Sequence, residues 1–463
     1  MGTQQRTLWL ERVRLPGGWQ DGLRLAVDDE GLITAVTPGE ADASDERIQG
    51  IVLPGMPNLH SHAFQRAAAG LTERRHTDSR DSFWSWREVM HGFVTRITPE
   101  QHQAIAAQLY VEMLKAGYTA VGEFHYLHLD DAGRAYADPA EMSRRAVTAA
   151  TEAGIGLTLL PVLYSVGGYR GKEPNDGQRR YILDVPDFLE IVSTLVADAE
   201  RTPGLRVGIA PHSVRQVPPE PLFEALNGVR AIDAEMPIHI HAAEQVRDVE
   251  EHIAITGAAP VEWLLANAPV NAHWCLVHAT HLSGDEVKGL ATSGAVAGLC
   301  PTTEANLGDG LFPLEDYLAA GGRFGVGSDS HVSVNLTEEL RWLEYGRRLK
   351  TLSRNVAAPG QGGSTGARLF DDALAGGAQA LGGSAGAIAA GMPADLIVID
   401  PDHPALYGRD GDAILDSWIF GASEPLVRHV MTAGRWVVRD GRHPTEERIA
   451  AAYCEAVAAL MAG

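Results

Sequence analysis

Two histidines, His60 and His62, follow an apolar run at residues 51–59. Residues two apart on a strand point to the same side, so the end of one extended segment can present both imidazoles to a single ion. A lone His-x-His pair is weak evidence for a metal site, because the chain contains 18 histidines, and some will pair by chance or lie at the surface. Residues further along the chain decide between these readings.

Three later segments with the composition of strands also end in residues that bind metals or transfer protons. These residues are His241, Glu244, His278 and Asp329, at the ends of segments 238–243, 275–280 and 323–328. Three of them have a structural alternative, since His241 and His278 could be buried core residues and Asp329 a helix N-cap. Three imidazoles and a carboxylate are a ligand set that suits zinc, with iron or manganese as alternatives, and they leave one position open for water.

The elements that would position these residues repeat along the chain. Between about residues 50 and 330, short β-branched runs alternate with longer amphipathic stretches, which is typical of repeated βα units. The candidate strands are 51–59, 119–126, 156–164, 205–212, 238–243, 275–280, 295–300 and 323–328. In a parallel barrel the carboxyl ends of the strands converge on one face, where activity resides. His239, earlier on its strand than His241, is assigned a structural role.

The two ends of the chain differ from its middle. Residues 8–48 and 394–443 have the pattern of short strands and turns, and they most simply meet as one sandwich. The predicted fold class is therefore α/β, a (β/α)8 TIM-type barrel with a small β-sandwich built from both chain termini. Its expected parts are the N-terminal sandwich piece, the metal-dependent barrel, and the C-terminal sandwich piece with a terminal helix, over residues 1–50, 51–390 and 391–463.

Composition restricts the partners. A formal net charge of −22 argues against nucleic acid, because that binding depends on Lys and Arg neutralising phosphates. The N-terminus has no apolar signal core and no run approaches a membrane span, so we expect no membrane partner. The 3 cysteines have no paired spacing and favour a reducing compartment. We expect a cytoplasmic protein that must bind any anionic substrate with local arginines.

The motifs His-x-His, His-x-x-Glu, His and Ser-Asp-Ser, each on a separate predicted strand, resemble the amidohydrolase superfamily. Its members pair such a barrel with a small sandwich from both chain ends. Many members bridge two metals with a carbamylated lysine at the end of strand four, but segment 209–212 here reads Ile-Ala-Pro-His. The chain therefore resembles the single-metal, deaminase-like branch. That resemblance implies one divalent metal ion, expected to be Zn²⁺, with the ligands His60, His62, His241 and Asp329.

Within that branch, segments 54–66, 81–87 and 212–215 resemble the formimidoylglutamate deiminases. This resemblance implies zinc-dependent hydrolysis of N-formimino-L-glutamate to N-formyl-L-glutamate and ammonia, a step of histidine degradation. It also implies a homodimer. Arg215 would hold one carboxylate of this small anionic substrate as a bidentate fork, and the pocket would be completed by Gln65, Arg87, Tyr126 and His212.

Some of these implied roles have alternatives. Arg87 could instead stack on a neighbouring tryptophan, Trp84 or Trp86, and other arginines nearby offer different registers, namely Arg74, Arg75 and Arg80. His278 is expected to accept the proton of the attacking water, Glu244 to deliver a proton to the leaving nitrogen, and Asp329 to accept a hydrogen bond besides ligating the metal. Which of the three moves each proton stays open.

Two other functions compete with this one. A single-metal deaminase of the same superfamily could act on a nucleobase or nucleoside-like ring. Such a pocket needs aromatic walls and amide-type hydrogen bonding more than two carboxylate anchors, so Arg215 and Arg87 argue against it. A non-catalytic scaffold is the second alternative. The presence of all four expected metal ligands argues against a scaffold.

Overall fold

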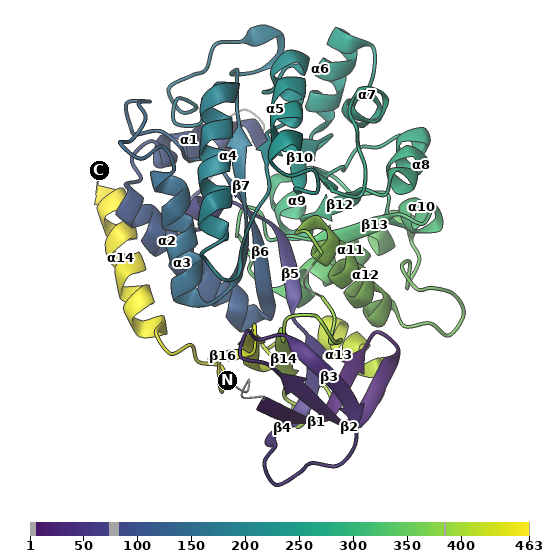
Figure 1. Cartoon of the computed structure of the whole chain (residues 1–463). Helices are drawn as coiled ribbons and strands as arrows, with labels where there is room; N and C mark the ends of the chain where they lie inside the picture. The colour runs from purple at the N-terminus through teal and green to yellow at the C-terminus, as the bar shows by residue number, and fades with distance from the viewer. Residues whose placement is uncertain (1–5, 74–82, 384–385, 463) are drawn as a thin grey trace.

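The computed structural model describes residues 6–73, 83–383 and 386–462. A ring of strands wrapped by helices forms the larger part, and a sheet built from both chain ends covers one end of it (Figure 1). The ring contains β5 Met56–Ser61, β6 Tyr118–His125, β7 Gly156–Leu163, β8 Leu205–Val207, β9 Ala210–Pro211, β10 Ile238–Ala242, β11 Trp274–His278, β12 Val296–Leu299 and β13 Arg323–Val326.

The strands of the ring pair in parallel in two groups, β5-β6-β7-β8 with β9 on β7, and β10-β11-β12-β13. Parallel bridges join the groups at both seams, from Ile209 to Ile238 and from Ser61 to Asp329. Backbone hydrogen bonds reinforce the second seam, where Asp329 N donates to the His60 carbonyl at 3.0 Å. These contacts are those of a parallel barrel, which confirms the predicted fold class.

The prediction of one strand over 51–59 is wrong, because this run contains two strands. β4 (Glu46–Pro54) belongs to the terminal sheet, and β5 starts at Met56. Pro54 has no N–H to continue the ladder, and at Gly55 a Cβ atom would collide with the side chain of Thr119. The chain therefore changes sheets within an unbroken apolar run, where hydrophobicity carries no signal of the change.

The helices that wrap the barrel follow the predicted alternation. They are α1 Phe83–Val94, α2 Pro99–Ala116, α3 Glu141–Ala153, α4 Val185–Ala199, α5 Pro219–Ile232, α6 Val246–Thr256, α7 Pro260–Asn267, α8 Gly284–Ser293, α9 Pro301–Leu307, α10 Leu314–Ala319, α11 Leu336–Thr351, α12 Thr365–Ala380, α13 Ala413–Gly421 and α14 Glu446–Ala462, with short 3₁₀ turns η1 Ala63–Ala68 and η2 Tyr169–Gly171. α2 begins after Thr98, whose side chain accepts from Gln101 N, and ends at Ala116, with Gly117 as its C-cap. None of the described helices has the length and hydropathy to cross a membrane.

The terminal sheet has the strand order β16-β15-β14-β4-β1-β2-β3. Its remaining strands are β1 Arg6–Leu15, β2 Gly18–Val27, β3 Ile33–Pro38, β14 Leu396–Ile399, β15 Val427–Thr432 and β16 Arg435–Val438. Leu8 and Leu25 from the N-terminal part share one buried cluster with Val398 and Met431 from the C-terminal part. Both chain ends therefore build one unit. The domain limits at residues 50 and 390 stay a prediction, and β4 runs across the first of them.

Candidate metal centre and active site

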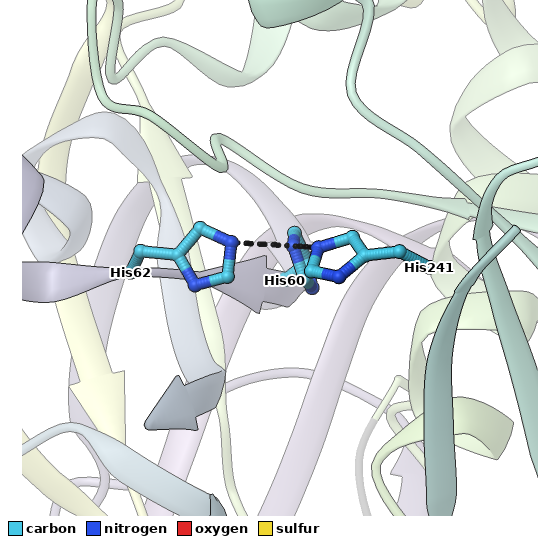
Figure 2. Close-up of side chains that lie close together, drawn as sticks. All are labelled: His60, His62 and His241. Carbon is cyan, nitrogen blue, oxygen red and sulfur yellow. Dashed lines mark hydrogen bonds between the residues drawn. The ribbon is translucent and has the colours of Figure 1, made fainter. Parts of the chain in front are cut away.

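Three imidazoles and a carboxylate converge at the carboxyl ends of β5, β10 and β13. The Nε2 atoms of His60 and His62 lie 3.1 Å apart, and those of His60 and His241 lie 3.2 Å apart (Figure 2). Asp329 Oδ1 lies 3.1 Å from Nε2 of His62 and 3.4 Å from Nε2 of His60. All four side chains are buried. The structure thus brings the four expected ligands to one point.

The tautomers of these imidazoles fit a metal ion. Nδ1 of His62 donates to the Phe124 carbonyl at 3.0 Å, and Nδ1 of His241 donates to the His212 carbonyl at 3.2 Å. Burial lowers the pKa of His60 to about 3 and holds the pKa of His241 well below its ordinary value. The rings of His60 and His241 are therefore neutral near pH 7, and the Nε2 lone pair of His241 points toward His60.

His60 Nε2 lies close to two imidazole nitrogens and a carboxylate oxygen, and a single hydrogen on it could bond to only one of them, whereas one cation can bind all of them. Zn–N bonds of about 2.0–2.1 Å place tetrahedral ligand atoms about 3.3 Å apart. The observed separations of 3.1, 3.2 and 3.4 Å are close to that value. The arrangement of donors therefore fits a metal ion.

The strand ends that carry the ligands are held by buried side chains. Asn58 on β5 donates to Ser328 Oγ at 2.6 Å and accepts from Ser328 N at 3.1 Å, which ties the end of β5 to the end of β13. Glu123 on β6 accepts from Ser61 Oγ at 2.6 Å and from Ala63 N at 2.7 Å, on both sides of His62. These bonds fix the direction in which the imidazoles point.

Backbone strain is concentrated at the same strand ends. Asp329 has φ 45°, and His278 has φ 66°, both in the left-handed region that non-glycine residues rarely adopt. Such strain persists only where the surrounding structure imposes it, and it clusters at functional sites. It follows that both side chains are held in directions that a regular strand end does not provide.

His278 lies beside the metal ligands and among carboxylates. Its Nε2 is 3.7 Å from Glu244 Oε1 and 3.9 Å from Asp329 Oδ2, and its Nδ1 is 3.3 Å from Glu304 Oε1. Burial alone would lower the pKa of His278, but Glu244 and the other two carboxylates outweigh it and raise the pKa to about 10. Burial also raises the pKa of Glu244 above its ordinary value. The pair is thus arranged to hold and move protons.

A pocket opens onto this centre and contains nearly all the expected site residues. Its lining is His62, Phe64, Gln65, Trp86, Arg87, Met90, Tyr126, Tyr164, Tyr181, His212, Arg215, His241, Glu244, His278, Leu307 and Asp329. Only His60 of the expected residues does not line it, since it is fully buried behind the others. The Tyr126 ring lies 4.7 Å from the His62 ring, and Gln65 Oε1 is buried with no hydrogen-bond partner among the described residues.

The two expected arginines are held by different partners. Arg215 Nη1 forms an ion pair with Asp248 Oδ1 at 2.7 Å, and Arg215 Nε donates to Gln216 Oε1 at 3.1 Å. Arg87 Nη2 donates to the Tyr164 hydroxyl at 2.7 Å. The alternatives for Arg87 that involve Arg74, Arg75, Arg80 and the side chain of Trp84 lie outside the described part of the chain. Two guanidinium groups therefore line the same small pocket.

Sequence reasoning missed several residues at this site. Glu304 orients His278 Nδ1 and stands in the first turn of α9, just after β12. An acidic residue that follows a barrel strand could have indicated this role from the sequence. Asp309 places one oxygen within 4.8 Å of Glu244 and His278 ligand atoms. Asp248 and Tyr164 hold the arginines, and neither stands in a motif that marks it as functional.

A barrel of parallel strands with imidazoles, a carboxylate and proton-transfer groups at their carboxyl ends defines a metal-dependent hydrolase. Comparison with known families agrees, since the profile of the amidohydrolase family matches residues 51–437. The chain belongs to the amidohydrolase family.

Individual members of the family are similar to this chain over most of its length. The formimidoylglutamate deiminase of Pseudomonas aeruginosa is 51% identical over 98% of this chain and 99% of its own length. A 5-methylthioadenosine/S-adenosylhomocysteine deaminase of Natronomonas pharaonis is 28% identical over 90% of this chain and 88% of its own. Among solved structures, an amidohydrolase from Brucella melitensis is 46% identical, covers 98% of this chain and 100% of its own, and superposes with a TM-score of 0.93.

Proposed function

We propose that the protein hydrolyses N-formimino-L-glutamate to N-formyl-L-glutamate and ammonia. The observation that carries the proposal is the presence of two arginines, Arg87 and Arg215, in the same pocket as the metal-type centre. A substrate with two carboxylates needs such cationic anchors, all the more in a protein with a net charge of −22. The 51% identity to the P. aeruginosa formimidoylglutamate deiminase supports the same substrate.

The cofactor in this proposal is one zinc ion, held by His60, His62, His241 and Asp329. Three nitrogen donors and one oxygen donor are a typical zinc set. No lysine is among the described residues that line the pocket, which argues against a second ion bridged by a carbamylated lysine. When bound, zinc lowers the pKa of a water ligand to about 7 and so supplies a nucleophile at neutral pH.

The protein's own residues then bind the substrate and move protons. Arg215, pre-positioned by Asp248, binds one carboxylate, while Arg87, Gln65, Tyr126 and His212 surround the rest of the molecule. Asp329 accepts the proton of the attacking water, and His278, which its carboxylate neighbours keep protonated near pH 7, stabilises the negative charge that develops on the added oxygen. Glu244, whose pKa burial raises, donates a proton to the amidine nitrogen. Water adds to the formimino carbon, the C–NH₂ bond breaks, ammonia leaves, and a formamide remains.

An ammonia-release assay tests the proposal. Zinc-loaded protein would be offered N-formimino-L-glutamate, N-formimino-L-aspartate, guanine, cytosine and adenosine. We expect turnover of the formimino glutamate with the highest kcat/KM, and a weaker rate with the shorter aspartate analogue. Higher kcat/KM for a purine or pyrimidine would replace the proposal with the ring-deaminase alternative, to which the 28% identical relative belongs.

The cellular setting is part of the same proposal. A step in amino-acid degradation fits the cytoplasmic location and the homodimer expected from the sequence. Cell fractionation and sedimentation of the purified protein test these two expectations separately from the reaction.

A further inference from the structure

Tyr164 lies immediately after β7 and lines the same pocket as Arg87 and Arg215. Its side chain is 1% exposed, and its ring centroid is 4.7 Å from that of His212. The hydroxyl accepts a hydrogen bond from Arg87 Nη2 at 2.7 Å and another from Gln178 Nε2 at 2.5 Å. Both partners of this buried hydroxyl are therefore nitrogen donors.

The direction of the bond from Gln178 is fixed by its other contacts. Gln178 Oε1 accepts from the Asn175 backbone N–H at 3.0 Å, and Gln178 Nε2 also donates to the Gly167 carbonyl at 3.2 Å. Turning the amide by 180° would set an N–H against the Asn175 donor and an oxygen against the Gly167 carbonyl. The amide nitrogen must therefore face Tyr164, and a guanidinium group can only donate.

A phenolic hydroxyl has one hydrogen to donate and two lone pairs that accept. The bonds from Arg87 and Gln178 occupy both lone pairs, so the O–H hydrogen must be directed to a third group. No hydrogen bond from this O–H to an acceptor is made by the residues that the structure describes. The hydroxyl thus presents a donor to the same pocket that contains Arg87 and Arg215.

We propose that Tyr164 is a further substrate-binding residue, whose hydroxyl donates to a substrate carboxylate beside Arg87. This inference rests on the proposed function and deepens it, because it assigns a neutral donor to the recognition of an anionic acceptor. A carboxylate can accept from the guanidinium and the hydroxyl together. A primary amide in its place would turn an NH₂ group toward one of these donors, so Tyr164 also discriminates acids from amides.

The central test replaces the hydroxyl. Tyr164→Phe should lower kcat/KM for N-formimino-L-glutamate by about 10–100-fold, since a hydrogen bond to a charged group contributes about that factor. The loss should appear in KM more than in kcat, because the hydroxyl touches a carboxylate and not the reacting carbon. Tyr317→Phe is the matched control: this tyrosine is equally buried and donates to the Arg323 carbonyl at 3.0 Å, at the start of β13 and outside the pocket lining.

A pair of variants at Gln178 separates the role of the hydrogen from that of ring packing. In Gln178→Glu the new carboxylate accepts the Tyr164 hydrogen and removes it from the substrate, so kcat/KM should fall as in Tyr164→Phe. In Gln178→Leu the hydroxyl keeps its hydrogen for the substrate, and the loss should be several-fold smaller than in Gln178→Glu. Equal losses in the two Gln178 variants would overturn the assigned direction of the hydrogen.

Truncated substrates and direct binding complete the test. Formimino derivatives of 4-aminobutyrate and of norvaline each lack one carboxylate, and the effect of Tyr164→Phe should vanish with one of them. Calorimetric binding of glutarate to zinc-loaded protein gives a readout without turnover, and it should weaken in Tyr164→Phe but not in Tyr317→Phe. If wild type turned over N-formimino-L-glutamate and Tyr164→Phe matched it within threefold, this inference would fail alone. If no formimino substrate reacted but glutarate binding depended on Tyr164, the proposed function would fail and the inference would stand.

Discussion

His239 and His241 stand on the same side of β10, yet only one of them faces the metal ligands. His239 lies about 6–7 Å deeper in the barrel, because it is two residues earlier on the strand. Its Nε2 donates to the Ala380 carbonyl at 2.9 Å, where the end of α12 closes the barrel interior. The depth of a histidine along the strand therefore separates a structural role from a ligand role.

This difference predicts opposite effects of two alanine variants. His60→Ala should lose the bound metal and the activity together, because it removes a ligand from a set of four. His239→Ala should retain both while its free energy of unfolding falls, since it leaves the buried Ala380 carbonyl unpaired. Elemental analysis, ammonia release and chemical denaturation would measure the three quantities. Full metal occupancy in His60→Ala would contradict the proposed ligand set.

The ion pair of Arg215 with Asp248 makes a single substitution at Arg215 ambiguous. Arg215→Met should lower kcat/KM for the formimino glutamate by about 10²–10³-fold, since a buried substrate charge loses its partner. It also strands Asp248, whose side chain is buried, and so should reduce stability.

The double variant Arg215→Met with Asp248→Asn resolves the ambiguity. It should recover most of the melting temperature while kcat/KM stays low and metal content stays normal. Recovery of kcat/KM together with stability would show that Arg215 acts only as a structural partner of Asp248.

Glu244 is the residue through which the leaving nitrogen is expected to gain its proton. Glu244→Gln should keep the metal and the affinity for glutarate but lower kcat by about 10²–10⁴-fold, the contribution typical of one positioned proton-transfer group. Steady-state kinetics and calorimetry would separate these effects. A near-normal kcat would mean that another group delivers this proton, and His278, which lies 3.7 Å away, is the nearest candidate.

At the scale of elements, α2 and β6 meet through buried histidines that the site does not use. The His102 and His125 rings are 5.2 Å apart, the His125 and His128 rings are 5.6 Å apart, and all three are buried. Both ring nitrogens of His102 and His125 have no hydrogen-bond partner among the described residues. Arg180, which is also buried, adds a positive charge nearby.

This cluster predicts loss of stability in mild acid. Burial lowers the pKa of His102 to about 3 and that of His128 to about 4, below the ordinary value of 6.5. Protons therefore bind the unfolded chain first as the pH falls below about 6.5, and each such histidine should cost about 2 kcal/mol of unfolding free energy at pH 5. Denaturation of His102→Leu should show a pH slope shallower than that of wild type by about 1.4 kcal/mol per pH unit. Parallel slopes would mean that His102 accepts a proton in the folded state.

Hydrophobic patterning predicted some elements of this fold and could not predict others. Strand ends such as His278 and Asp329 stand out because a polar residue interrupts an apolar run. The passage from β4 to β5 was missed because Pro54 and Gly55 sit inside one continuous apolar run. Glu304 and Asp248 were missed because a carboxylate on a helix looks like an ordinary surface residue until the fold buries it. Partners of this kind are set by packing between distant segments, which no local pattern records.

At the scale of the whole molecule, the chain ends depend on each other. β4 pairs with β1 on one side and with β14 on the other, so residues from near 400 complete the sheet that residues from near 10 begin. α14 packs along α2 on the outside of the barrel (Figure 1).

Two truncations should therefore differ. Removal of residues 391–463 leaves β4 with an open apolar edge and exposes the cluster around Leu8 and Leu25, and this variant should aggregate and bind no metal. Removal of residues 446–462 takes away only α14, and this variant should remain folded with a lower melting temperature. Light scattering and metal content would compare them. A metal-loaded, monodisperse product of the larger truncation would show that the barrel folds without its sheet.

The short connection at Gly55 couples the terminal sheet to the metal ligands. Only one residue separates the end of β4 from the start of β5, and His60 and His62 follow within the same short stretch. Successive residues of a strand alternate in direction, so a slip of β4 by one position against β14 would turn both imidazoles out of the barrel. The register of the terminal sheet thus determines the direction in which His60 and His62 point. Any redesign of the chain termini would have to preserve this register before preserving stability.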